Sequence, residues 1–184
     1  MDRLILEIQD NLKRKNYLSA LSLTLTLPDI CGKIAFPEMK KNGRSDVGGR
    51  YARWYNEYIY PSENPPYLFA FDTSESIPVN PLNGYAVYKL RCALLHEGSL
   101  EIQTAVERNL HENHQVYKKM EFHINDKLTS IGSFWESGKK NEQTITIRIG
   151  VEDFCNKICW TAEDYYKKHS TNEIFNKIIK FDFL

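Results

Sequence analysis

The chain has 184 residues, of which 42% are hydrophobic and 26% charged, the composition of a globular domain with a sizeable core. Basic and acidic residues number 24 each, so the formal net charge is zero and nothing steers the whole chain towards nucleic acid or an anionic membrane. A net charge of zero does not exclude a local basic patch. Acidic and basic residues are interleaved with apolar ones in the N-terminal segment, and no apolar run approaches the roughly 18–20 residues needed to span a bilayer. We therefore expect a soluble cytoplasmic protein with no signal peptide and no membrane partner.

The first segment, residues 2–27, is predicted to be a long helix, because leucine and isoleucine recur three, four and seven residues apart, with a slip around Asn16. Pro28 is expected to end it. Asp29 then offers an N-cap for a short helix over residues 30–36. Asp29 therefore stands at a chain reversal between apolar segments, where it is a candidate partner for a buried cation.

A loop is predicted over residues 40–49. Its glycines and basic residues do not match a phosphate-binding loop, because the Gly-Lys-Ser/Thr ending and the preceding strand are missing. Ser45 or Asp46 is expected to cap the next helix, residues 47–60.

Helix 47–60 combines aromatic and basic residues. Its aromatic side chains fall on one side, and they are Tyr51, Trp54, Tyr55 and Tyr58. Arg50 and Arg53 lie beside these rings and could stack on the bases of RNA. The alternative, which we favour on the residues alone, is that the rings pack inward and the arginines face solvent.

Residues 61–81 hold five prolines and are predicted to be a surface connection or a lid. The next helix, NGYAVYKLRCALLHEG at residues 83–98, is apolar on almost every side, which predicts a position at the centre of the domain. Asn80 or Asn83 is its expected N-cap, and Gly98 its expected C-terminal end.

Two polar residues interrupt this central helix. Arg91 falls within the most apolar arc, so it must find a carboxylate, a backbone acceptor or an anionic ligand, because an unpaired buried charge is very costly. Asp29 and Asp46 are the candidate internal partners. His96 lies in the last turn, where the helix dipole favours a cationic imidazole and where histidine can titrate near neutral pH.

The rest of the chain predicts a mixed region and more helix. A helix is expected over residues 100–111, followed by a small antiparallel hairpin or meander with strands at residues 116–124 and 143–149. Residues 151–168 form an amphipathic helix with Phe154, Ile158 and Tyr165 inward. A short last helix is expected to end near residue 180.

These elements predict a mainly α fold in a single domain. Its parts are a helical core over residues 1–115, a β-hairpin insertion over residues 116–150, and C-terminal helices over residues 151–184 that pack on the core.

No metal or cofactor is expected. The histidines His111, His114 and His123 lack zincin spacing and a third ligand. Cys155 and Cys159 share one helix face and could be half of a zinc site, but the other two cysteines are distant in sequence. Cys155 and Cys159 are therefore expected to pack as small hydrophobic residues with reduced thiols.

The segment RCALLH, with four residues between Arg91 and His96, resembles the Arg-x4–6-His motif of the HEPN superfamily. This superfamily comprises helical domains of prokaryotic nucleotide-binding, toxin and defence systems. The segments LPDICG at residues 27–32 and YKLRCALLHEG at residues 88–98 also look like a family of bacterial proteins near HEPN. The resemblance covers roughly the first hundred residues.

The resemblance implies a HEPN-like helical bundle that forms a homodimer, in which two copies of the motif meet in a cleft. It also implies metal-independent cleavage of RNA, with Arg91 and His96 catalytic and with Tyr88 and Cys92 in support. His96 would move protons and Arg91 would stabilise charge at phosphorus. Cys92 stands where many members have a polar residue.

Geometry sets a condition on this activity. Side chains five residues apart on an ideal α-helix point about 140° apart. Arg91 and His96 can then converge only through the reach of arginine and a frayed helix end, or through a second subunit.

Two other hypotheses stay open. The chain could be a non-catalytic interaction module that binds an antitoxin or a defence partner, with Arg91 paired internally and His96 capping its own helix. It could also bind a small molecule or nucleotide beneath the proline-rich connection, although no ligand signature supports this.

Overall fold

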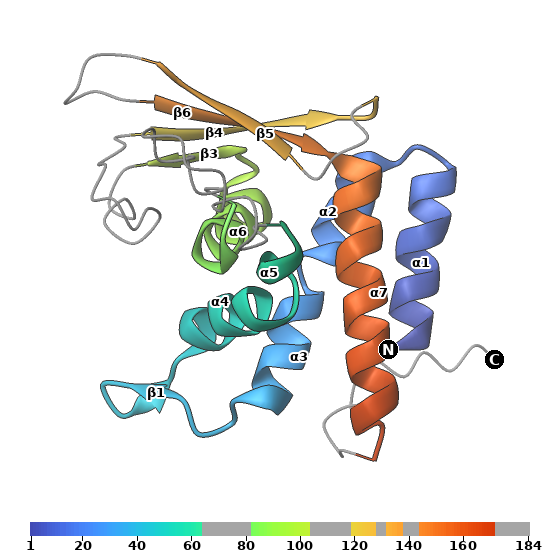
Figure 1. The fold of residues 1–184 in the computed structure, drawn as a ribbon, viewed down its shortest axis with the longest axis vertical. Coiled ribbons are helices and arrows are strands. Elements are labelled where there is room, and N and C mark those ends of the chain that lie inside the picture. Colours follow the sequence, from blue (N-terminus) through green and yellow to red (C-terminus); the bar gives the residue numbers. More distant parts are fainter. Residues whose placement is uncertain (64–81, 104–118, 128–131, 138–143, 172–184) are drawn as a thin grey trace, which may run out of the picture.

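The computed structural model describes residues 1–63, 82–103, 119–127, 132–137 and 144–171. This part of the chain is mainly helical, with small sheets, as predicted. The helices are α1 (Asp2–Lys13), α2 (Tyr17–Thr24), α3 (Leu27–Ala35), α4 (Val47–Tyr58), α5 (Tyr60–Glu63), α6 (Gly84–Cys92) and α7 (Val151–His169). The larger sheet lies at one end of this helical body, next to α6 (Figure 1).

The predicted first helix is divided, and the second begins earlier than expected. α1 and α2 are separated at the slip around Asn16, where Lys15 adopts a φ of 59°. α3 begins at Leu27, because Pro28 lies in its first turn, where a missing N–H and a fixed φ cost nothing. Asp29 is therefore not an N-cap. It lies inside the first turn of α3, and its side chain is available to another partner.

The predicted loop over residues 40–49 contains a short hairpin. β1 (Lys40–Lys41) pairs antiparallel with β2 (Arg44–Ser45), and Asn42 and Gly43 have φ values of 52° and 75°. Positive φ at both central positions is typical of a tight hairpin turn. Asp46 then caps α4 by accepting a 2.9 Å hydrogen bond from the Gly49 N–H, as predicted.

The central helix is confirmed, with one difference in its last turn. Asn83 caps α6, accepting 3.0 Å hydrogen bonds from the N–H groups of Tyr85 and Ala86. After Cys92 the helix continues as a π-helical turn, Ala93–Glu97. Gly98 ends it in the left-handed conformation, with a φ of 62°.

The backbones of α3 and α6 lie directly against α4. A Cβ added at Gly32 of α3 would lie 2.7 Å from the carbonyl oxygen of Arg50, and one added at Gly84 of α6 would meet the carbonyl oxygen of Ala52. Only glycine permits these approaches. They hold α3 and the start of α6 against α4, and the contacts of Arg91 with Asp29 and of Tyr88 with Gly48 place the end of α6 near the first turn of α3 and the start of α4.

The larger sheet is mixed, and this corrects the predicted antiparallel hairpin. β3 (Glu101–Gln103), β4 (Lys119–Asn125), β5 (Gly132–Ser137) and β6 (Thr144–Gly150) lie in the order β3-β4-β6-β5. The two predicted strands, β4 and β6, are neighbours but parallel. β5 lies in the stretch predicted to be turns and pairs antiparallel with β6. The chain therefore reverses its direction between β5 and β6. β3 occupies the start of the segment predicted as helix 100–111.

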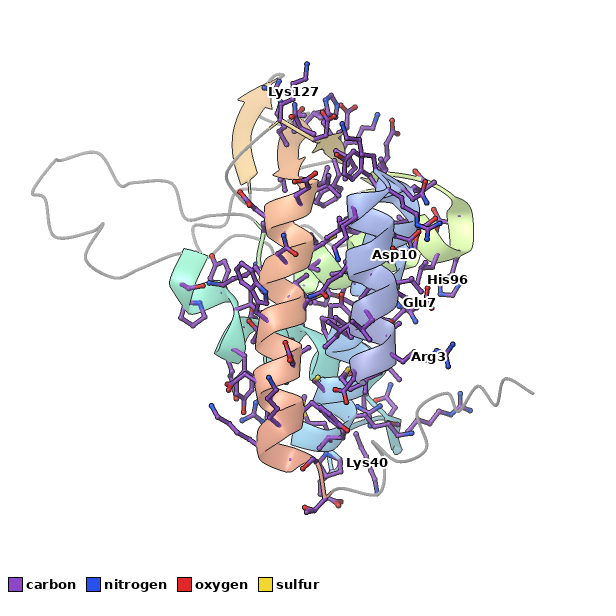
Figure 2. The ribbon with its side chains drawn as sticks, turned by 90° about the vertical axis from the view of Figure 1, so that its right-hand side faces the viewer. Arg3, Glu7, Asp10, Lys40, His96 and Lys127 are labelled. Carbon is purple, nitrogen blue, oxygen red and sulfur yellow. The ribbon has the colours of Figure 1, made fainter. Side chains whose placement is uncertain are left out.

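α7 closes the helical body. It packs on α1, α2 and α3, and it lies beside α1 in both views (Figures 1 and 2). Phe154, Ile158 and Tyr165 are buried, as predicted. Cys155 and Cys159 are also buried, and burial raises the pKa of each thiol to about 12, so they pack as small hydrophobic residues.

Among the described residues, one segment is long and apolar enough to cross a membrane, Tyr17–Ala35. It comprises α2 and α3, half of it is buried within the fold, and a core helix of a soluble protein meets the same criteria. The predicted surface connection or lid over residues 61–81 begins within α5, and its remainder, residues 64–81, lies outside the described residues. His111, His114 and the last helix beyond residue 171 also lie outside them.

Candidate functional site

Arg91 on α6 faces the first turn of α3. Its Nη2 lies 2.9 Å from Oδ2 of Asp29, and the two side chains are 21% and 20% exposed. The first turn of α3 thus supplies Arg91 with one of the two carboxylates that the sequence suggested. Asp46, the other one, is used as the cap of α4. The ion pair is buried enough to be held in place and open enough to reach a ligand.

His96 lies beside the same guanidinium. Nη1 of Arg91 is 3.1 Å from Nε2 of His96. Arginine can only donate, so Nε2 of His96 is the acceptor in this contact. The His96 side chain is exposed and lies at the edge of the molecule (Figure 2). An imidazole and a guanidinium therefore meet at the surface.

The π-helical turn explains how these two side chains meet. Hydrogen bonds in a π-helix join residues five apart, so the residue at i+5 lies nearly above residue i. Such turns are often found at functional sites. Arg91 and His96 are five residues apart, and the turn Ala93–Glu97 lies between them, so the divergence of about 140° expected on an α-helix is reduced and the side chains meet at 3.1 Å. Their convergence within one chain requires neither a frayed end nor a second subunit.

Tyr88 and Cys92 flank the pair on α6, one turn apart. The pKa of Tyr88 is raised to about 12, mainly by burial and secondly by a hydrogen bond with the Cys92 thiol. The Tyr88 ring covers the start of α4, where a Cβ added at Gly48 would lie 2.7 Å from it. Tyr88 therefore stays protonated and forms one wall of the site.

Tyr51 on α4 lies behind the ion pair, and the sequence analysis assigned it only to the core. Its ring centroid is 5.3 Å from that of Tyr88, and its side chain is fully buried. The pKa of the Tyr51 hydroxyl is raised, mainly by burial and secondly by the charge of Asp29. This hydroxyl has no hydrogen-bond partner among the described residues. Tyr51 thus places a neutral hydroxyl close to the Asp29–Arg91 pair.

The two arginines predicted to contact RNA differ from each other. Arg50 is only 9% exposed, which corrects the expectation of an exposed side chain. α3 lies against the Arg50 backbone, where a Cβ added at Gly32 would meet the Arg50 carbonyl oxygen, and the charge of Arg50 acts on Asp29. Arg53 is exposed, pairs with Glu57 at 2.6 Å, and lies over the Phe36 ring at 4.2 Å. Contact of Arg53 with RNA stays a prediction.

The pKa of the Asp29 carboxyl is raised, although two cations face it. Burial is the largest cause, and the charges of Arg91 and Arg50 only partly oppose it. For Arg91, burial lowers the pKa, but Asp29 and Cys92 raise it by more, so its pKa is raised overall. Both charged groups gain from the pair, and only at Asp29 does burial outweigh that gain. The carboxyl governs the pH dependence, because arginine is charged at every relevant pH. A pKa that burial shifts beside a specific charged partner makes the Asp29–Arg91 pair a candidate functional site.

We expect Gly98→Ala to lower the free energy of unfolding by about 1 kcal/mol, because its φ of 62° is strained for a residue with a Cβ. The Gly98 N–H and the Ser99 N–H both bond to the Ala93 carbonyl, so the same change shifts the turn that carries His96. Urea unfolding measures the stability loss. Gly98→Asn is the control, because asparagine tolerates this conformation. Equal stability of the glycine and alanine proteins would contradict the prediction.

Within the described part of the chain, no group of three or more His, Cys, Asp or Glu residues is placed to hold a metal ion. His123 on β4 is exposed and lies 3.8 Å from Glu121. Comparisons of the chain with protein-family models, with curated proteins and with solved structures found no match. Its function therefore has to be inferred from its own residues.

Proposed function

We propose that Arg91 and His96 form the active site of a metal-independent endoribonuclease with a HEPN-like helical bundle. The observation that carries the proposal is the 3.1 Å contact between Arg91 Nη1 and His96 Nε2, made across a π-helical turn. The Arg-x4-His motif supports the same activity by resemblance. The proposed enzyme is a cytoplasmic homodimer of bacterial defence, in which two such pairs line one cleft.

The chemistry uses the two side chains in different roles. A phosphate that accepts hydrogen bonds from Arg91 frees Nε2 of His96 to take the proton of the ribose 2′-hydroxyl. The 2′-oxygen then bonds to phosphorus, the 5′-oxygen leaves, and the products are a 2′,3′-cyclic phosphate and a 5′-hydroxyl. Arg91 stabilises the negative charge that grows on the phosphorus oxygens.

The leaving 5′-oxygen needs a proton from a second acid. In the proposed dimer this acid is the protonated His96 of the second copy, which approaches the same phosphate from the other side of the cleft. Asp29 acts on Arg91 and not on the substrate, because its carboxylate fixes the guanidinium from the side opposite His96.

Cleavage of RNA in EDTA tests this proposal. A labelled single-stranded RNA is incubated with the protein beside a DNA of the same sequence. We expect the RNA to be cut to fragments that end in a 2′,3′-cyclic phosphate and the DNA to stay intact, because DNA lacks the 2′-hydroxyl. Intact RNA, or cleavage that EDTA abolishes, would overturn the proposal.

The second candidate function is a non-catalytic interaction module of a bacterial defence or toxin–antitoxin system with the same helical fold. The Asp29–Arg91 ion pair favours it, because that hypothesis requires an internal partner for Arg91. The two functions differ in what a conservative change at Arg91 does. Arg91→Lys keeps a charge beside Asp29, so it preserves a structural role and impairs a catalytic one.

A further inference from the structure

A basic hairpin stands at the start of α4. Lys40, Lys41 and Arg44 occupy β1 and β2, and all three side chains are exposed. Within the described residues, none of the three makes an ion pair or a side-chain hydrogen bond. Because the chain as a whole has no net charge, three unpaired cations on one hairpin form a distinct local patch.

This hairpin borders a cavity that reaches α6. The cavity has a volume of about 630 Å³, and its lining includes Lys41 and Arg44 of the hairpin and Tyr88 of α6. Tyr88 precedes Arg91 by three residues, so the two side chains are neighbours on the surface of α6. The cavity therefore connects the hairpin with the helix face that carries the Arg91–His96 pair.

The electrostatics of the cavity favour an anion. Gly48 and Val47 place the first turn of the twelve-residue helix α4 along its floor, with the positive end of the helix dipole. One carboxylate, that of Asp46, also lines the cavity, but it accepts the hydrogen bond from the Gly49 N–H. Two unpaired cations thus face one carboxylate that already has a partner.

We propose that this cavity binds the phosphates of single-stranded RNA next to the scissile bond, through Lys41 and Arg44. The proposal rests on the proposed function, because it treats Arg91 as the site of the scissile phosphate. An RNA strand whose scissile phosphate lies at Arg91 and whose backbone passes Tyr88 brings its neighbouring phosphates to the hairpin. An unpaired strand is the substrate, because attack by the 2′-oxygen opposite the leaving oxygen requires a backbone free to rotate.

Binding measured at several salt concentrations tests the proposal. Fluorescence anisotropy follows a labelled single-stranded RNA bound to the 184-residue His96→Ala protein, in which the proposed binding groups are intact and cleavage is slowed. Lys41→Ala with Arg44→Ala is compared with Lys13→Ala with Lys15→Ala. The control pair is also exposed and removes the same charge, but it lies at the end of α1, away from the hairpin (Figure 1).

Removal of two phosphate contacts is expected to make the slope of log K against log salt shallower by about 1.4, since each contact to a single strand contributes about 0.7. The control pair is expected to keep the slope of the parent protein. Equal slopes for the two double variants, or no RNA binding by the parent protein, would overturn the proposal. Cleavage by the wild type is scored separately on gels, so RNA cutting with equal slopes leaves the proposed function standing and removes only the hairpin site.

Discussion

Replacing His96 with alanine is expected to slow RNA cleavage at least about a hundredfold, because a positioned general base contributes about that factor or more. The free energy of unfolding is expected to change by less than about 0.5 kcal/mol, because the His96 side chain is exposed and caps no buried group. Single-turnover cleavage of labelled RNA in EDTA measures the first effect. Thermal unfolding measures the second.

His123→Ala is the matched control for this change. His123 is an exposed histidine on β4, in the sheet and not on the π-helical turn. We expect it to cleave RNA at the rate of the wild type. A His96→Ala protein that also cleaves at this rate would remove His96 from the mechanism and assign the cleavage to another site or to a contaminating nuclease.

The pairing at this site was predictable, because it follows from local chemistry. An arginine in the apolar arc of a central helix demands a carboxylate, and Asp29 stood at a chain reversal between apolar segments. The ends of the central helix were also predictable, since Asn83 and Gly98 are residues that favour the N-cap and the left-handed end.

The π-helical turn was not predictable from the residue pattern. The segment ALLHE is equally compatible with an α-helix, and only the hydrogen bonds of its backbone distinguish the two. Burial of Arg50 was missed for a different reason. Its position beside the aromatic face of α4 suggests exposure, but the contact of Gly32 with the Arg50 carbonyl brings α3 over it. That contact joins distant parts of the chain.

The sheet shows the same limit at a larger scale. Both strands of the predicted hairpin exist as β4 and β6, because their β-branched and aromatic residues favour extended backbone. In the sequence, β5 lies between β4 and β6. Because β5 runs antiparallel to β6, β6 can run parallel to β4. Strand propensity is local, whereas pairing direction is decided by which segments meet.

Replacing Arg91 with alanine is expected to lower the free energy of unfolding at pH 7 by about 2 kcal/mol. This is less than the loss of about 3–5 kcal/mol for breaking a fully buried pair, because Asp29 is 20% exposed. The loss corresponds to a fall of about 4–8 °C in the melting temperature. An unchanged melting temperature would show that Asp29 does not depend on Arg91.

The loss is expected to depend on pH in a specific direction. Burial already raises the pKa of Asp29 in the folded protein, and removal of Arg91 raises it further. Below the pKa of about 3.9 in the unfolded chain, the carboxyl is neutral in both states and the cost of its burial is absent. The penalty of Arg91→Ala therefore appears as the pH rises through the pKa of folded Asp29. Unfolding in urea at a series of pH values measures it.

A double-mutant cycle separates the ion pair from the catalytic role of Arg91. Asp29→Asn removes the charge whose burial is costly, so the double variant Asp29→Asn with Arg91→Ala should recover much of the stability lost in Arg91→Ala. Arg91→Lys should keep most of the stability, because it retains a cation beside Asp29. It should still slow RNA cleavage, because lysine cannot contact Asp29, His96 and a phosphate at once with a planar fork of donors. Wild-type cleavage by Arg91→Lys would assign Arg91 to the fold alone and favour the non-catalytic module.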